Sequence, residues 1–202
     1  MFSGIILRMS KPVLLSGVQA TGKSHLGNYF GAMKQFVELA EDHDSFVFIA
    51  DYHSLTTIQD PKVLRQNILD IALDYLAIGL NPEKTTLFKQ SDVAEHTELA
   101  WIFNCVTPMN ELQRMTQFKD KSKVQSKNIN AGLLTYPILQ AADILLYRGT
   151  HVPVGDDQKQ HLELTRDIAG KFNNDFKNEL IEEGFEDGDF FPITEPLISG
   201  PA

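Results

Sequence analysis

Residues 14–28 read LLSGVQATGKSHLGN, and this stretch decides the fold. The stretch begins within an apolar run over 13–16, which is typical of a short buried strand. A glycine-bearing turn of the size that holds a phosphate follows, and apolar residues then recur at helical spacing over 26–41. Strand, turn and helix together predict the first unit of a nucleotide-binding α/β fold.

The turn itself has two interpretations. Residues 17–24 fit the pattern G-x-x-x-x-G-K-S. In this pattern backbone N–H groups bind the phosphates, the Lys contacts phosphate and the Ser hydroxyl binds magnesium. On that interpretation the chain is a P-loop NTPase or kinase, and residues 46–51 resemble a strand that ends in a magnesium-binding aspartate. The second interpretation places phosphates over the helix that opens at 25–28, because helix N-termini present unpaired N–H groups and partial positive charge.

Strands and helices continue to alternate along the chain. Further apolar runs typical of strands lie at 46–50, 86–89 and 151–154. Helical periodicity covers 158–172 and a segment that runs to about Ile78, where Asp60 and Pro61 supply an N-cap and a first-turn proline. The alternation predicts an α/β class fold, a Rossmann-like parallel sheet with right-handed crossovers and helices on both faces.

The domain boundaries follow from the same pattern. We predict one Rossmann-type domain over residues 11–202, incomplete at its C-terminal end, preceded by an N-terminal extension over 1–10. A helical insert at about 92–150 separates the two halves of the fold. The acidic stretch that begins at Glu179 leads into extended structure, and we expect no closing helix or strand after it.

Composition narrows the function. The chain has 202 residues, 43% of them hydrophobic, enough to bury the core of one good-sized domain. Its net charge of −9 argues against a broad nucleic-acid-binding face, so RNA would bind locally or through parts outside the chain. Its apolar runs fall far short of the ~20 residues that a membrane helix needs. Cys105 is the single cysteine, which fits a reducing cytoplasm.

Five further segments agree with the second interpretation of the turn. They are ADYH at 50–53, LQRMTQFK at 112–119, LLTYP at 133–137, AADILLY at 141–147 and VPVGDDQKQH at 152–161. Together with HLGN at 25–28, they closely resemble the bacterial-type tryptophanyl-tRNA synthetase family of class I aminoacyl-tRNA synthetases, from about Val13 onward. The P-loop interpretation explains none of these segments.

The resemblance implies ATP-dependent activation of L-tryptophan to tryptophanyl-adenylate, with Mg²⁺ assisting, and transfer to tRNA(Trp). It implies His25 and Asn28 as catalytic residues that stabilise charge on the phosphates. The ATP-binding residues that it implies are Gln19, Ala20, Thr21, Gly27, Asn28, Gly155, Asp156 and Asp157. We expect no metal-ligating side chains. On the residues alone, His25 is equally a solvent-facing first-turn residue, and Asp157 an ordinary N-cap.

Asp143 is the sharpest specificity residue. It lies in the apolar run 139–147, where an unpaired carboxylate carries a desolvation penalty, so some group should donate a hydrogen bond to it. The resemblance implies that this donor is the indole N–H of tryptophan, and a hydrogen-bonding site rejects an analogue without the donor by roughly 10⁴ or more. The alternatives are a helix-surface aspartate or an ion pair with Arg148 or Arg166.

Three other residues are expected around the amino acid. Tyr136 lies seven residues before Asp143, on the same helix face, so both side chains fit one pocket. The resemblance assigns Tyr136 and Gln158 to the substrate ammonium group and places His53 near the amino acid. Tyr136 is equally explained as a packed aromatic. Leu15 and Gln140 replace an aromatic and a Met of some relatives, so the apolar packing around the indole is expected to differ.

The remaining expectations concern the end of the chain and its assembly. The family's Lys-Met-Ser-Lys-Ser loop and anticodon-binding domain should lie beyond Ala202, so we expect this chain to bind tryptophan and ATP but to activate tryptophan weakly. An alternative is a non-catalytic tryptophan-binding module that ends naturally there. The resemblance also implies a homodimer, through the apolar residues Trp101, Ile102, Phe103, Val106, Met109 and Met115. The alternative is that these residues are internal core, which is the more common use of apolar side chains.

Overall fold

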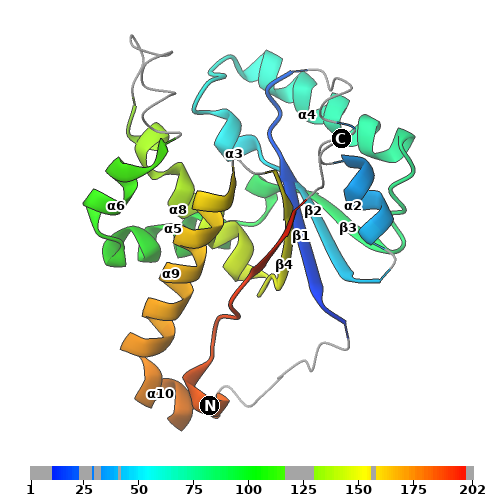
Figure 1. Cartoon of the computed structure of the whole chain (residues 1–202). Helices are drawn as coiled ribbons and strands as arrows, with labels where there is room; N and C mark the ends of the chain where they lie inside the picture. Colours follow the sequence, from blue (N-terminus) through cyan, green and yellow to red (C-terminus); the bar gives the residue numbers. More distant parts are fainter. Residues whose placement is uncertain are drawn as a thin grey trace.

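A parallel sheet forms the centre of the protein (Figure 1). The computed structural model describes residues 11–22, 29, 33–40, 42–116, 130–155 and 158–198. Five strands pair in parallel in the order β3-β2-β1-β4-β5. Their bounds are β1 (Val13–Val18), β2 (Asp44–Ile49), β3 (Thr85–Lys89), β4 (His151–Val154) and β5 (Glu195–Ile198). The predicted Rossmann-like α/β fold is confirmed.

Helices cover both faces of the sheet (Figure 1). On one face lie α2 (Lys34–Leu39) and α4 (Pro61–Ala77), and on the other lie α8 (Ala131–Leu146) and α9 (Lys159–Asp175). Successive residues of a strand point to opposite faces. Leu14 accordingly packs with Phe36 and Tyr75 of the first pair of helices, whereas Leu15 packs with Ile144 and Leu162 of the second pair. This two-sided burial explains why the strand is a continuous apolar run.

The elements described between β3 and β4 are all helices. They are η2 (Gln90–Asp92), α5 (Glu95–Val106), α6 (Met109–Arg114) and α8. These helices and α9 enclose an apolar cluster that contains Phe103, Leu112 and Met115. Phe103 and Met115 therefore follow the alternative interpretation, internal core, because both side chains fill the interior of the insert. Trp101, Ile102 and Met109 are exposed.

The last described segment also differs from the expectation. Residues Glu195–Ile198 pair in parallel with β4 as the fifth strand, where we expected no closing strand. Pro196 conceals this strand in the sequence, because proline cannot donate to a ladder and is confined mainly to edge strands. The position of β5 at the edge of the sheet meets that condition. The acidic stretch before it contains α10 (Lys177–Glu182) and η4 (Glu186–Gly188).

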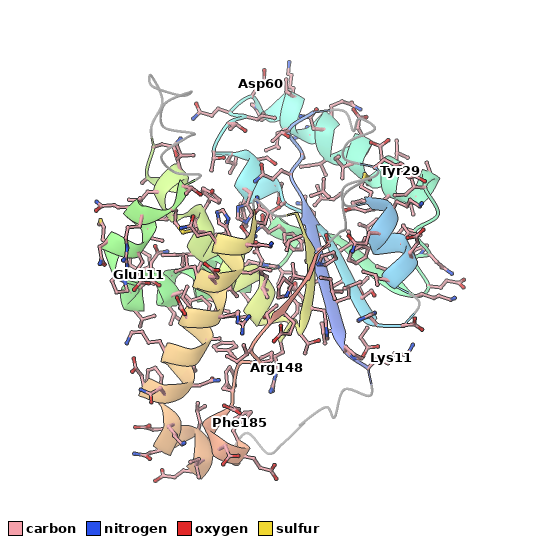
Figure 2. The ribbon with its side chains drawn as sticks, viewed as in Figure 1. Lys11, Tyr29, Asp60, Glu111, Arg148 and Phe185 are labelled. Carbon is pink, nitrogen blue, oxygen red and sulfur yellow. The ribbon has the colours of Figure 1, made fainter. Side chains whose placement is uncertain are left out.

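The helix α4 begins as its sequence predicts. The Asp60 carboxylate accepts hydrogen bonds from the backbone N–H groups of Lys62, at 2.8 Å, and Val63, at 3.3 Å. Figure 2 shows Asp60 at the exposed start of this helix. The helix ends before Gly79, whose φ of +100° suits glycine. Even this long helix does not have the length and apolar character that crossing a membrane requires, and the same holds for the other described helices.

We expect Asp60→Ala to lower the free energy of unfolding by about 1 kcal/mol, because two N–H groups of the first turn lose their acceptor. Urea denaturation followed by circular dichroism measures this change. Asp74→Ala is the matched control, since Asp74 lies in the last turn of the same helix, where the helix dipole disfavours a negative charge. Equal losses in the two variants would contradict the capping role.

Candidate functional site

A cavity of about 490 Å³ lies at the carboxyl ends of β1 and β4. The chain runs outward from β1 to β3 and then returns to β4 on the other side of β1, so the strand order reverses between these two strands. Open parallel sheets bind their ligands in the crevice at such a point. The cavity walls include Leu15 and Gly17 of β1 and Val152 and Val154 of β4.

Six of the predicted site residues line this one cavity. They are Gln19, His53, Tyr136, Asp143, Gly155 and Gln158. They come from the turn after β1, from α3 (Asp51–Ser54), from α8, and from the turn between β4 and α9. The two helical turns between Tyr136 and Asp143 place both side chains on the cavity face of α8, in agreement with their sequence spacing.

The other predicted ATP-binding residues do not line the cavity or lie outside the described residues. Ala20 is buried, and its backbone holds the turn in place: its N–H donates to Ser54 Oγ at 2.8 Å, and its carbonyl accepts from Asn67 Nδ2 at 2.9 Å. Thr21 is exposed. His25, Gly27, Asn28, Asp156 and Asp157 are outside the part of the chain that the structure describes.

Gly17 has a structural explanation that needs no phosphate. It is paired in register with Phe48 of β2, and the Phe48 ring lies over it. A Cβ atom on Gly17 would meet Phe48 Cζ at 2.4 Å, far inside van der Waals contact. The absence of a side chain therefore lets the Phe48 ring pack against the strand and form part of the cavity wall. This packing weakens the P-loop interpretation of the turn.

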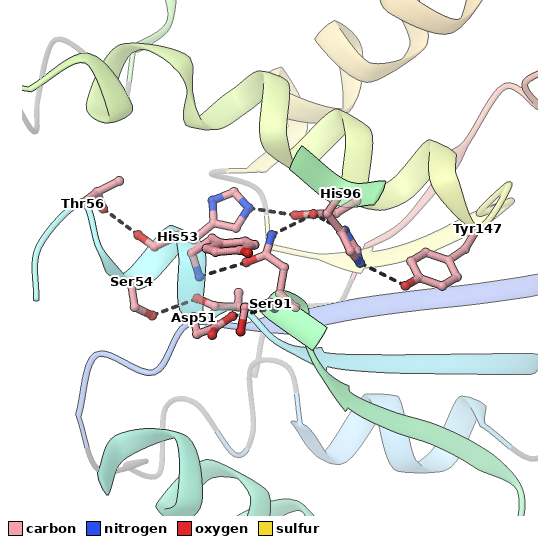
Figure 3. A network of polar contacts seen from close by, with 11 residues as sticks. Asp51, His53, Ser54, Thr56, Ser91, His96 and Tyr147 are labelled. Atoms are coloured by element: carbon pink, nitrogen blue, oxygen red, sulfur yellow. Dashed lines mark hydrogen bonds and ion pairs between the residues drawn. The ribbon is translucent and has the colours of Figure 1, made fainter. Parts of the chain in front are cut away.

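Asp143 is the centre of a buried hydrogen-bond network. Figure 3 shows this network and labels two of its members, His53 and His96. Its carboxylate is completely inaccessible, at 0% relative exposure. Oδ2 lies 2.8 Å from His53 Nε2, and Oδ1 lies 2.6 Å from His96 Nδ1 and 2.8 Å from Gln90 Nε2. Because an ionised carboxylate only accepts hydrogen bonds, each of these nitrogens donates. The expectation that Asp143 needs donors is confirmed, and protein side chains supply three of them.

The charge state of Asp143 follows from this environment. Burial raises the pKa of its carboxyl, but the hydrogen bonds from His53 and His96 outweigh that effect and hold the pKa below its ordinary value. The group is therefore a carboxylate at neutral pH. The alternative partner Arg148 is turned elsewhere, with its guanidinium 5.9 Å from the centre of the Phe190 ring (Figure 2).

Sequence reasoning missed Gln90, His96 and Tyr147. His96 is fully buried, and its Nε2 lies 2.9 Å from the Tyr147 hydroxyl. Burial, together with the negative charge of Asp143, raises the pKa of Tyr147 to about 12, so its hydroxyl keeps its proton. One sequence signal was available, because His96 shares the buried stripe of α5 with Ala100 and Phe103 at positions i, i+4 and i+7.

Tyr136 also has a polar partner. Its side chain is buried, and its hydroxyl lies 2.9 Å from Nε2 of His161 on α9. The rings of Tyr136 and His53 meet edge to face, with centroids 6.2 Å apart. Tyr136 and His53, both expected around the amino acid, are therefore neighbours in one wall. The parallel sheet and the crevice at its strand-order reversal place the protein in the general class of nucleotide-binding α/β folds.

Comparison with known proteins narrows that class. The family profile described as tRNA synthetases class I (W and Y) matches residues 8–199. This match covers nearly the whole chain, and the chain therefore belongs to the class I tRNA synthetases of the W and Y group. The resemblance read from the motifs is confirmed, and the P-loop interpretation is set aside.

Individual relatives agree with the family assignment. The chain is 55% identical over 190 residues to a tryptophan–tRNA ligase of Caulobacter vibrioides, a match that covers 94% of this chain and 53% of the relative. The tryptophan–tRNA ligase of Brucella melitensis is 51% identical over 201 residues, with 95% and 57% covered. The chain thus spans about half the length of these curated relatives.

A solved structure of similar fold carries ligands. The tryptophanyl-tRNA synthetase of Campylobacter jejuni, described as complexed with ADP and tryptophan, has a TM-score of 0.82 and 43% sequence identity to this chain. The match covers 93% of this chain and 55% of that one.

Replacing Asp143 should strongly destabilise the fold. We expect Asp143→Ala to lower the free energy of unfolding by about 3 kcal/mol, because three buried donors lose their acceptor. Urea denaturation measures the change. Tyr75→Phe is the control, because burial alone raises the pKa of Tyr75 and its hydroxyl has no hydrogen-bond partner within the described residues. A loss below about 1 kcal/mol for Asp143→Ala would show that the network contributes little.

Proposed function

We propose that the chain carries the amino-acid and ATP site of a tryptophan–tRNA ligase. The observation that carries the proposal is the ionised Asp143, placed in the wall of a cavity at the strand-order reversal. Leu15, Phe48, Ile144, Val152 and Val154 line the same cavity as this acceptor. A buried acceptor beside such apolar side chains favours a ligand that has an apolar ring and one N–H donor, and the indole ring has both properties. The names of the relatives support the same substrate.

The amino-acid end of the site is proposed as follows. Asp143 accepts the indole N–H, and His53 lies beside it in the same wall. Tyr136 and Gln158 line the cavity from α8 and from the start of α9, and they are proposed to hold the substrate ammonium group. Leu15 and Ile144 line the same wall and provide apolar contact with the ring, and Gln140 completes the wall.

The ATP end of the site is proposed at the turns after β1 and β4. Gln19 and Gly155 line the cavity there, next to the positions of His25, Asn28, Asp156 and Asp157 in the sequence. The magnesium expected with ATP would neutralise phosphate charge. Within the described ranges, no group of three or more His, Cys, Asp or Glu side chains is placed to hold a metal by itself.

The reaction proposed for the complete protein has two steps. The tryptophan carboxylate attacks the α-phosphorus of ATP and forms a new O–P bond. The bond between this phosphorus and the oxygen that bridges to the β-phosphate breaks, and pyrophosphate leaves. In the second step a hydroxyl of tRNA(Trp) attacks the carbonyl carbon of the adenylate, an ester bond forms, the anhydride bond breaks, and AMP leaves. Alignment of the two substrates and stabilisation of phosphate charge account for such a displacement, and no protein acid or base is strictly required.

Calorimetric titration tests the site directly. We expect the chain to bind L-tryptophan and to bind L-tyrosine far more weakly, because the phenol ring has no N–H to place at Asp143. Asp143→Asn should lower the affinity for tryptophan at least about tenfold, since an amide is a weaker acceptor than a carboxylate. ATP is titrated separately. Absence of any amino-acid binding would overturn the proposal, and tight magnesium-dependent binding of GTP would favour the P-loop interpretation.

We also propose that the protein forms a homodimer through the exposed apolar patch of Trp101, Ile102 and Met109 on α5 and α6. Trp101 is 71% exposed, Met109 61% and Ile102 49%, and exposed apolar patches mark protein–protein interaction sites. Trp101 also lines a smaller cavity of about 220 Å³ that shares His53 and Tyr136 with the proposed tryptophan site. A partner at this patch would therefore adjoin the substrate pocket.

Analytical ultracentrifugation measures the assembly. We expect Trp101→Glu to convert a dimer into a monomer, because the substitution buries a charge in the interface. Leu73→Glu is the matched control, because Leu73 on α4 is similarly exposed, at 63%, and lies outside the patch. The dimer proposal fails if the unaltered chain sediments as a monomer, or if both variants dissociate it equally.

A further inference from the structure

The Asp143 carboxylate has four acceptor positions, and the structure accounts for three. A carboxylate oxygen accepts about two hydrogen bonds. Oδ1 receives one from His96 and one from Gln90, so it is saturated. Oδ2 receives one from His53. The remaining position therefore lies on Oδ2, and a ligand N–H donor has only this oxygen to approach.

The two oxygens also differ in their surroundings. His53, the partner of Oδ2, lines the cavity. His96 and Gln90, the partners of Oδ1, are both 0% exposed and are not part of the cavity wall. The two donors to Oδ1 thus lie away from the cavity, whereas Oδ2 shares its donor His53 with the cavity wall, to which Asp143 itself belongs.

Gln90 and His96, the two donors to Oδ1, are each held in one orientation. Gln90 Oε1 accepts the backbone N–H of Tyr52 at 3.2 Å, which directs its amide nitrogen at Asp143. His96 is fixed through its second ring nitrogen, which lies 2.9 Å from the Tyr147 hydroxyl. The rings of Phe48, Phe88 and Tyr147 pack around the imidazole at centroid distances of 5.9, 6.0 and 5.4 Å. His96 therefore has little freedom to turn away.

We infer that His96, oriented by Tyr147, is a positioning residue that sets the preference for tryptophan by aiming Asp143 Oδ2 into the cavity. The inference rests on the proposed function, because it concerns the group that accepts the indole N–H. His96 does not contact the ligand. It acts by preventing rotation of the carboxylate, which would otherwise turn the partly filled oxygen away from the indole nitrogen.

Two ligands separate this role from general support of the fold. L-Tryptophan donates from its indole N–H, whereas L-3-benzothienylalanine has the same shape with sulfur in place of that group. We expect His96→Leu to weaken tryptophan binding about tenfold and to change the affinity for the sulfur analogue less than about threefold, because only tryptophan uses Oδ2. Isothermal titration of both ligands against the unaltered chain and the variant measures the difference.

A conservative variant provides the rescue. The side-chain amide nitrogen of asparagine occupies nearly the place of the imidazole Nδ1, so His96→Asn retains the donor to Oδ1 and should keep tryptophan binding within about threefold of the unaltered chain. If His96→Leu fails to fold, Tyr147→Phe decides the question, because it removes only the hydroxyl that orients His96. We expect it to weaken tryptophan binding selectively, whereas Tyr75→Phe, the same change at a distant buried tyrosine, should not.

The outcomes distinguish the inference from the proposed function. If tryptophan and the sulfur analogue lose affinity equally in His96→Leu and Tyr147→Phe, the positioning role is overturned while tryptophan binding by the chain still stands. If the unaltered chain binds no tryptophan, both the proposed function and the inference fail. A loss confined to tryptophan, together with rescue by asparagine, supports the positioning role.

Discussion

The buried charge of Asp143 is the constraint on which the rest of the site depends. An isolated carboxylate in a protein interior costs several kcal/mol, and this cost is offset only if donors surround it. Those donors come from α3, η2 and α5, whereas the acceptor lies on α8. Because α3 follows β2 and η2 follows β3, the parallel order of the sheet brings them to one edge. The charge in turn fixes how the helical insert sits on the sheet.

The sequence predicted the fold and much of the cavity wall because both follow from local patterns. Apolar runs and caps such as Asp60 predicted the strands and the helix α4, and the spacing of Tyr136 and Asp143 predicted their shared face. The partners of Asp143 were not predictable in this way, because His96 and Gln90 are 47 and 53 residues away in the chain. Their pairing exists only after the insert has folded against β2 and β3.

Two differences between expectation and structure, in the insert and at β5, have a similar origin. In each, the same residue type is compatible with two structural environments. The apolar side chains of Phe103 and Met115 fit an interface as well as an interior, and packing among α5, α6 and α8 decides for the interior. The proline of β5 usually breaks a strand, but an edge position tolerates it. The P-loop pattern shows the same ambiguity, because Gly17 satisfies a sequence motif while its actual role is to accommodate the Phe48 ring.

The convergence of three donors on Asp143 also bears on how such a pocket changes during evolution. A single substitution at Asp143 leaves His53, His96 and Gln90 without their acceptor, so the first step toward another ligand carries a large penalty in stability. A viable route must remove or redirect the donors before it removes the acceptor. Ligand preference in this pocket is therefore protected by epistasis, and laboratory libraries that vary only the cavity wall are expected to return few folded variants with a new preference.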